Sequence, residues 1–138
     1  MQSSAKQPPT QRRLILIRHA KAVEEAAGGD HARPLSERGL ADAASLGSWL
    51  TEQKLVADLA LCSTATRTRQ TLAVLGNNIP TILNDKLYLA TTNEMLTQIQ
   101  ATDDALKTLM LVCHNPGAHA LLGLLVDDCA ICFYYASG

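Results

Sequence analysis

Short apolar runs alternate along the chain with segments in which apolar residues recur every three or four positions. The apolar runs predict strands at 13–17, 58–62, 80–83, 109–113 and 131–135. The periodic segments between them predict helices. Because strand and helix alternate throughout, we predict an α/β fold: a three-layer α/β/α sandwich in which helices cover both faces of a mostly parallel central sheet.

The first two predicted helices follow polar residues that are typical of helix starts. Ser36 is placed to cap a helix that carries Glu37 in its first turn, where a negative charge favours the positive end of the helix dipole. Ser63 or Thr64 is placed to cap a second helix, which runs to about Leu75. Both helices are therefore expected to begin shortly after a loop or a strand end.

The last two predicted helices carry start signals of their own. Thr91 and Glu94 have the spacing of a capping box. Asn115 is the N-cap candidate of the other helix, with Pro116 at the first helical position, where the missing N–H of proline costs nothing. This last helix runs to about Val126 and is apolar almost all round, so we expect it to lie centrally in the fold.

The composition fits one compact domain and narrows the possible partners. Of 138 residues, 47% are hydrophobic and 18% charged, which is enough apolar surface for a core and excludes global disorder. We expect a flexible tail at 1–12 and a single domain at 13–138. A net charge of −1 argues against a nucleic-acid binder. No apolar run could cross a bilayer and no secretory signal is evident, so we expect a cytoplasmic protein without membrane contact. We also expect the protein to be a monomer.

The four cysteines leave a redox function as a poorer alternative. Cys129 and Cys132 form a C-x-x-C motif, but a zinc site would need a second pair at suitable spacing. A redox C-x-x-C normally opens a helix, whereas this one lies in an apolar run that predicts a strand. We therefore interpret the cysteines as buried or half-buried thiols that act as small hydrophobic residues.

Polar residues gather where the predicted strands end. Arg18 and His19 follow the first strand, Arg67 lies in the first turn after the second, and His114 follows the fourth. In a doubly wound sheet these positions share one edge, where ligands bind. Arginine stays charged and matches phosphate oxygens, and a neutral imidazole beside cations is a competent nucleophile. Each residue alone could be a strand cap or a solvated charge, but together they predict a phosphoryl site.

The motifs at these strand ends resemble those of the histidine phosphatase superfamily. The triplet at 18–20, Arg-His-Ala, is similar to the Arg-His-Gly signature of that family. Residues 63–71 resemble its Ser-Pro-x-x-Arg-x-x-Gln-Thr segment, with Thr64 in place of the usual proline. Residues 112–117 resemble the segment that carries its second catalytic histidine, and the loop at 30–39 is close to the SixA-type branch, the phosphohistidine phosphatases.

This resemblance implies a phosphoglycerate mutase-like fold and a role for each matching residue. His19 would be the nucleophile and transient phosphohistidine, while Arg18, Arg67 and His114 would form the rest of the phosphate pocket. The family uses no metal, and the resemblance implies no other cofactor. Arg33 lies in a loop that faces the same edge, where it either contacts the substrate or is a structural arginine.

One departure from the family pattern bears on the substrate. Members that act on alcohol phosphates place a carboxylic acid after the third strand to protonate the leaving oxygen, whereas the sequence at 87–90 reads Leu-Tyr-Leu-Ala. The nearest acid, Glu94, belongs to the capping box. Phosphohistidine is a phosphoramidate with a better leaving group, so it tolerates the absence of a general acid. We therefore expect a phosphohistidine-bearing protein of the histidine phosphotransfer type as substrate.

Two alternatives to this function stay open at this point. Glu24, Glu25 or Asp30 of the first loop could move in and supply the acid, which would favour a small-molecule phosphomonoesterase of the same fold. The chain could also be a regulatory module that binds phosphate without turnover. That module would bind phosphate without ever forming a phosphoryl-enzyme. An attempt to trap the phosphoryl-enzyme therefore distinguishes an enzyme from a non-catalytic module.

Overall fold

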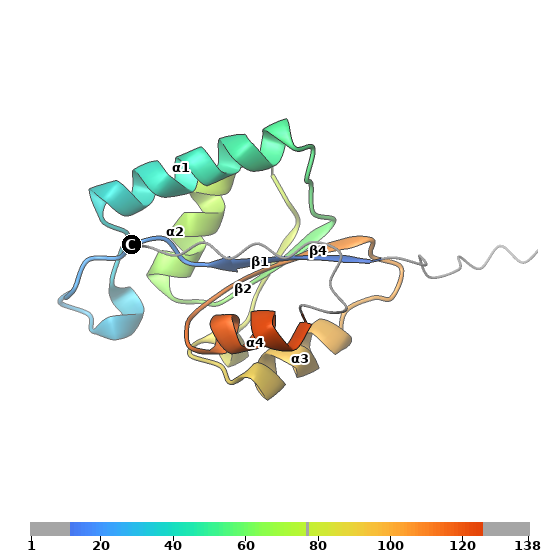
Figure 1. Cartoon of the computed structure of the whole chain (residues 1–138). Helices are drawn as coiled ribbons and strands as arrows, with labels where there is room; N and C mark the ends of the chain where they lie inside the picture. The colour runs from blue at the N-terminus through green and yellow to red at the C-terminus, as the bar shows by residue number, and fades with distance from the viewer. Residues whose placement is uncertain (1–11, 77, 126–138) are drawn as a thin grey trace, which may run out of the picture.

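Four parallel strands form the middle layer of the computed structural model, which describes residues 12–76 and 78–125 (Figure 1). The strands are β1 (Arg13–Arg18), β2 (Leu59–Cys62), β3 (Thr81–Leu83) and β4 (Thr108–Cys113). The helices are α1 (Glu37–Glu52), α2 (Thr66–Leu75), α3 (Thr92–Gln100) and α4 (Gly117–Leu125). Two short 3-10 turns, η1 (Asp30–Ala32) and η2 (Asp85–Leu87), lie in the loops that follow β1 and β3.

The strand order across the sheet is β1-β4-β2-β3, and every pairing in it is parallel. Helices α1 and α2 cover one face of the sheet, and α3 and α4 cover the other (Figure 1). The predicted α/β/α sandwich is therefore confirmed, with a sheet that is parallel throughout its described part. Because all of these strands end at the same edge, the loops that follow β1, β2 and β4 come together there.

The sheet is buried mainly because β1 and β4 carry apolar residues on both faces. Ile15 and Ile17 of β1 pack on the side of α1 and α2, whereas Leu16 packs on the side of α3 and α4. All three are fully buried, and every position of β4 is buried as well. Since successive strand side chains point to opposite faces, one apolar run supplies two cores at once. β3, at the edge, has all three of its residues exposed.

Two of the predicted helix starts are confirmed by side-chain caps. At the start of α1, Ser36 Oγ accepts a hydrogen bond from Gly39 N at 3.0 Å. At the start of α3, Thr91 and Glu94 form the reciprocal capping box. Gly39 also lets α1 lie against the loop after β1, because a Cβ at this position would lie 2.0 Å from the carbonyl oxygen of Lys21.

The predicted cap of α2 is wrong. The helix begins at Thr66 and has no side-chain cap. The two hydroxyls that were expected to cap it bind other partners: Ser63 contacts His114 at 2.8 Å and Thr64 donates to Asp85 at 2.5 Å. Both hydroxyls thus face the loops at the carboxyl edge of the sheet rather than the first turn of their own helix.

The predictions for α4 are wrong in its start and in its burial. The helix begins at Gly117 rather than at Pro116, although Asn115 still supplies a capping oxygen, because its Oδ1 accepts from His119 N at 3.2 Å. The helix is not central either, since Leu124 is 57% exposed. α4 belongs to an outer layer, so only one of its faces packs against the sheet, however apolar the other face is.

Several predictions made from the sequence lie outside the described residues. They are the tail at 1–12, apart from its last position, the strand at 131–135 and the Cys129–Cys132 motif. Cys62 and Cys113 are buried, and burial raises the pKa of both thiols to about 12, in keeping with small hydrophobic residues. No helix in the described part of the chain is long and apolar enough to cross a membrane.

Candidate active site

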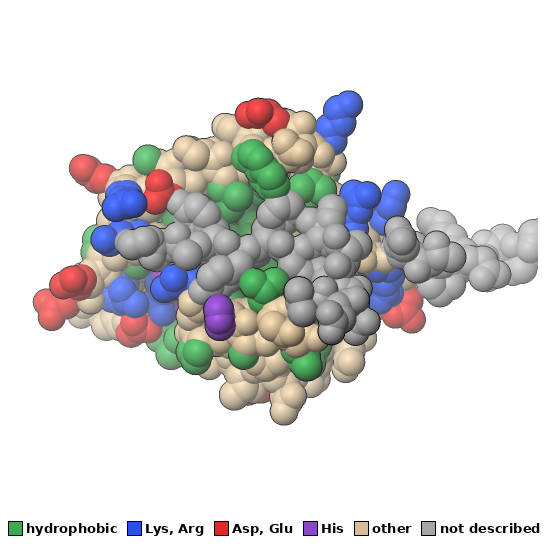
Figure 2. Space-filling model, in the orientation of Figure 1, with side chains coloured by type: hydrophobic (Ala, Val, Ile, Leu, Met, Phe, Trp, Pro, Cys, Tyr) green, Lys and Arg blue, Asp and Glu red, His purple; other side chains and the backbone are tan. Residues whose placement is uncertain are grey.

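The carboxyl ends of β1 and β4 open into a cavity of about 370 Å³. Its walls include all five residues that the sequence predicts for a phosphate site, namely Arg18, His19, Arg33, Arg67 and His114. Basic and acidic side chains lie side by side at this end of the molecule, around the loop after β1 and the first turns of α1 (Figure 2). The structure thus brings the predicted residues together, while their roles in catalysis remain predictions.

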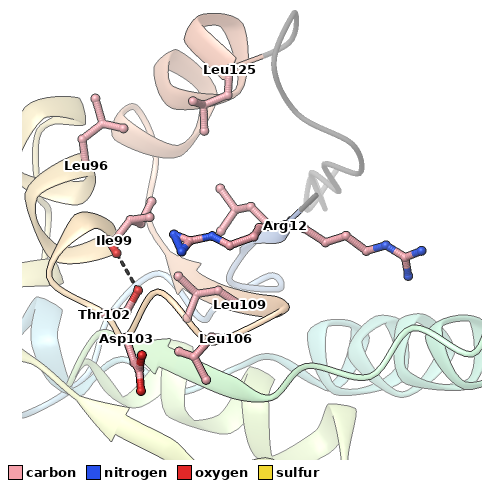
Figure 3. A pocket seen from close by; sticks show the side chains of 10 residues that line it. Arg12, Leu96, Ile99, Thr102, Asp103, Leu106, Leu109 and Leu125 are labelled. Atoms are coloured by element: carbon pink, nitrogen blue, oxygen red, sulfur yellow. Dashed lines mark hydrogen bonds between the residues drawn. The ribbon is translucent and has the colours of Figure 1, made fainter. Parts of the chain in front are cut away.

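A second cavity, of about 350 Å³, lies at the opposite edge of the sheet, where β1 and β4 begin (Figure 3). Its lining is mainly aliphatic and includes Leu96, Ile99 and Leu109. Among the described residues that line it there is neither a histidine nor a cysteine, and its two arginines come from the start of the first strand. Of these two cavities in the described part of the chain, the one at the carboxyl edge therefore fits the chemistry of phosphoryl transfer.

His19 is held as a neutral imidazole with a defined proton position. Its Nδ1 lies 2.7 Å from the carbonyl oxygen of Ala20, and a carbonyl only accepts, so Nδ1 carries the proton. Burial, together with the charges of Arg67 and Arg18, lowers the pKa of His19 to about 4 against the opposing effect of the Ala20 bond. The lone pair is therefore on Nε2, which is the form that a nucleophile requires.

The guanidinium of Arg67 lies almost completely buried beside this lone pair. Its Nε donates to His19 Nε2 at 3.3 Å, and the side chain is only 2% exposed. The backbone of α2 is fixed next to the end of β1 by Thr71, whose Oγ1 accepts from Ala20 N at 3.0 Å and donates to Arg67 O at 2.7 Å. This local bridge explains why a residue in the first turn of α2 reaches the end of the first strand.

His114 faces His19 across the site. The two ring centroids are 5.3 Å apart, and the ring planes are inclined by 58°. Burial, followed by the charge of Arg67, lowers the pKa of His114 to about 3, so it too is neutral. Its Nε2 lies 2.8 Å from Ser63 Oγ, and its Nδ1 is buried without a hydrogen-bond partner among the described residues.

The proton position on His114 follows from the bonds of Ser63. Ser63 Oγ accepts from Ala65 N at 3.3 Å, and His114 Nε2, at 2.8 Å, is the acceptor that the hydrogen bonds of the described residues offer to its proton, so we assign Ser63 as the donor to Nε2. His114 then carries its own proton on Nδ1. Ser63 is therefore a residue of the site, which sequence reasoning missed because a serine after a strand is also a typical helix cap.

The other two predicted arginines differ in how their donors are used. Arg18 Nε is buried and has no partner in the described part of the chain. Arg33 instead braces its own loop, because its Nε donates to Asp30 Oδ1 at 2.9 Å and its Nη1 to Val23 O at 2.7 Å. Arg18 Nε is thus a buried donor that an anion could use. Arg33 Nε and Nη1, in contrast, are already bonded within the loop.

Asp30 is the loop residue for which the sequence left open whether it could supply the general acid. Its carboxylate accepts hydrogen bonds from the hydroxyl of Tyr88 and the guanidinium groups of Arg33 and Arg67. These bonds, led by that of Tyr88, hold the pKa of Asp30 well below its usual range. Asp30 is therefore ionised and bound to the arginines, so it does not hold a proton for a leaving group.

Tyr88 connects the loops around the cavity. Its ring meets His114 edge-on at 5.5 Å and His31 at 4.7 Å between centroids. The hydrogen bond to Asp30 raises the pKa of the Tyr88 phenol, so this residue is neutral and a poor proton donor. The segment in which the family places an acid thus presents an aromatic ring to the second histidine.

Comparison with known proteins identifies the family of the chain. Residues 14–88 match the model of the histidine phosphatase superfamily (branch 1). An uncharacterised protein of Mycobacterium tuberculosis is 40% identical over 111 residues, which are 80% of this chain and 70% of that protein. Among solved structures, SixA of Nakamurella multipartitia has a TM-score of 0.77 and 36% identity, covering 89% of this chain and 74% of its own. SixA of Agrobacterium tumefaciens has a TM-score of 0.79 and 34% identity, covering 87% and 80%. The chain therefore belongs to the histidine phosphatase superfamily, in its SixA-type branch.

Proposed function

We propose that the chain hydrolyses phosphohistidine on a partner protein through a covalent phosphohistidine intermediate at His19. Membership of the superfamily supports phosphatase activity, and the SixA proteins of Nakamurella multipartitia and Agrobacterium tumefaciens are themselves proposed to be phosphohistidine phosphatases. The observation that carries the proposal is the neutral His19, whose Nε2 lone pair lies beside the buried Arg67 guanidinium on the wall of an open cavity.

In the first step, the hydrogen bond from Arg67 Nε to His19 Nε2 breaks and the freed lone pair of Nε2 forms a bond to the phosphorus. The bond between phosphorus and the substrate's imidazole nitrogen breaks. The electron pair of that bond stays on the departing nitrogen. Arg67 and Arg18 stabilise the negative charge on the equatorial oxygens during transfer. His114 adds a hydrogen bond from its Nδ1–H, the buried donor that has no other partner in the described part of the chain.

In the second step, a water oxygen forms a bond to the phosphorus and the bond to His19 Nε2 breaks. The electron pair returns to Nε2, and the group leaves as dihydrogen phosphate with both hydrogens of the water. Throughout both steps the His19 Nδ1 proton stays in its bond to the Ala20 carbonyl. The positive charge that this reaction needs comes from arginine side chains, so we propose that no metal takes part.

The protonation of the nearby residues favours a phosphoramidate substrate. Asp30 is ionised, Tyr88 has a raised pKa, and hydrogen bonds from Thr91 lower the pKa of Glu94. An alcohol phosphate would need a protonated acid for its leaving oxygen, and lack of one costs about 10²–10⁴ in rate. The imidazole of phosphohistidine leaves as a neutral ring when its other nitrogen carries a proton. The partner that we propose is a histidine phosphotransfer-type protein.

The test is to trap the phosphoryl-enzyme. A histidine phosphotransfer domain that carries radioactive phosphohistidine is mixed with wild type, with His19→Ala and with His119→Ala, which replaces an exposed histidine of α4. We expect acid-labile label on wild type and His119→Ala, none on His19→Ala, and the same result in the presence of a metal chelator.

Two other outcomes would replace the proposal. Phosphate binding without label in any variant would support the non-catalytic module. Label together with comparable turnover of a sugar phosphate and of the phosphoprotein would support the small-molecule phosphomonoesterase. Loss of label on addition of the chelator would contradict the metal-independent mechanism alone.

A further inference from the structure

Leu89 combines an apolar side chain with a backbone conformation that folding does not favour. Its φ is 52°, in the left-handed region, where a Cβ crowds the backbone and glycine is the preferred residue. Its side chain is 54% exposed and lines the cavity that holds His19, Arg67 and His114. A strained, exposed leucine beside reactive groups suggests that the side chain serves the site rather than the core.

The residues on either side of Leu89 explain how it is held there. Leu87 is fully buried, and Ala90 is only 6% exposed. The carbonyl oxygen of Ala90 lies against Gly117 of α4, where a Cβ would come within 2.4 Å of it. Thr91 then caps α3. Because the chain is anchored immediately before and after Leu89, its side chain is presented at the rim of the cavity.

The polarity of the cavity indicates what Leu89 can contact. Arg18, Arg67 and His114 provide donors for phosphoryl oxygens, and an aliphatic side chain provides none. Leu89 therefore matches a part of the substrate other than its phosphoryl group. Residues held in strained backbone conformations cluster at active sites and ligand clamps, so a contact between Leu89 and the bound partner would account for both its left-handed φ and its exposure.

We propose that Leu89 is a specificity-determining residue that packs against the apolar surface around the phosphohistidine of a protein substrate. The proposal rests on the proposed function, because it concerns the same site and the same phosphoryl donor. It predicts that the contact is made with the protein that carries the phosphohistidine, so small phosphoryl donors do not gain from it.

The test compares two phosphoryl donors across matched variants. The donors are a phosphorylated histidine phosphotransfer domain and phosphoramidate, which has a P–N bond and no apolar part. Leu89→Gly and Leu89→Asn remove the apolar contact but suit the left-handed backbone, and Leu89→Met retains an apolar side chain. The control is Leu83→Ala, because Leu83 is 50% exposed on β3 and does not line the cavity.

We expect Leu89→Gly and Leu89→Asn to lower kcat/KM for the phosphoprotein about tenfold, mainly through KM, while turnover of phosphoramidate stays within about twofold. Leu89→Met and Leu83→Ala are expected to resemble wild type with both donors. The Tm of Leu89→Gly is expected to equal or exceed that of wild type, because glycine relieves the strained φ.

Other results would overturn the proposal. An unchanged kcat/KM for the phosphoprotein, or an equal loss with both donors, would mean that Leu89 does not select the protein. A third donor, p-nitrophenyl phosphate, carries an aromatic leaving group but no protein. An equal loss of kcat/KM with this donor would mean that Leu89 contacts the ring of the leaving group and not the protein around it. A fall in Tm as large as that of Leu87→Ala would make the side chain structural. If wild type hydrolyses phosphoramidate but not the phosphoprotein, the proposed function fails, and the role of Leu89 fails with it.

Discussion

Arg67 binds Asp30 through two of its nitrogens: Nη1 donates to the backbone carbonyl at 2.7 Å and Nη2 to Oδ2 at 3.1 Å. Both donors belong to the guanidinium that we propose for the phosphoryl oxygens. Asp30 thus occupies, through its backbone carbonyl and its carboxylate, two donors that the substrate would use. Phosphate binding and the Asp30–Arg67 contact therefore compete.

We predict that Asp30→Asn tightens the binding of inorganic phosphate about tenfold, because a neutral amide competes less strongly for Arg67 than a carboxylate does. The expected effect is no larger because the Asp30 carboxylate is half-exposed and solvent weakens its bond to Arg67. Titration calorimetry with phosphate measures the effect. Glu25→Gln removes one negative charge from an exposed position of the same loop and is expected to change the affinity far less. Equal effects of the two variants would show that the competition is only long-range repulsion.

The guanidinium fork of Arg67 is expected to be irreplaceable by another cation. Arg67→Lys keeps the charge but loses the planar fork, which can present donors to two phosphoryl oxygens at once. We predict a fall in kcat/KM of about 10²–10³, comparable to the loss of a donor to a developing anion. Arg69→Lys, an exposed position of the same helix, serves as the control and should be neutral. A loss below about threefold in Arg67→Lys would mean that charge alone is enough.

The sequence allowed the sheet and the convergence of the site to be predicted, because both depend on local patterns. An apolar strand with a capped helix after it is visible in the residues themselves, and parallel topology brings the strand ends to one edge whatever the length of the connections. Arg18, His19 and His114 could be placed for this reason alone, since each lies at or directly after the end of a strand.

Contacts between loops could not be predicted in the same way. The position of Asp30 beside Arg67 depends on a 3-10 turn that is far from Arg67 in the chain. Ser63 binds His114 instead of capping its own helix because tertiary packing brings the two side chains together. The exposure of Leu124 was missed because periodicity describes a helix, while the number of layers decides how many of its faces are covered.

The two buried histidines are expected to make stability fall with acid. Their pKa values in the folded chain are about 4 for His19 and about 3 for His114, below the unfolded value near 6.5. Between these limits the unfolded chain binds more protons, so the stabilisation is complete above pH 6.5 and is lost as the pH falls toward 4. Thermal unfolding from pH 7.5 to 4.5 measures the slope. His19→Gln should reduce it, whereas His119→Gln should not, and equal slopes in all three proteins would contradict the assignment.

Ser63 is expected to act by fixing the proton of His114. Its hydroxyl lies 2.8 Å from His114 Nε2, and the assigned network places the imidazole proton on Nδ1. In Ser63→Ala the proton can move to Nε2, so the hydrogen bond to the phosphoryl group is lost, and we predict a fall in kcat of about tenfold with little change in KM. The ¹⁵N shifts of His114 distinguish this from a structural effect: they should report Nδ1–H in wild type and in Ser63→Thr, and a mixture of tautomers in Ser63→Ala. A lower kcat with an unchanged tautomer would show that Ser63 supports the fold of the loop and not the proton of His114.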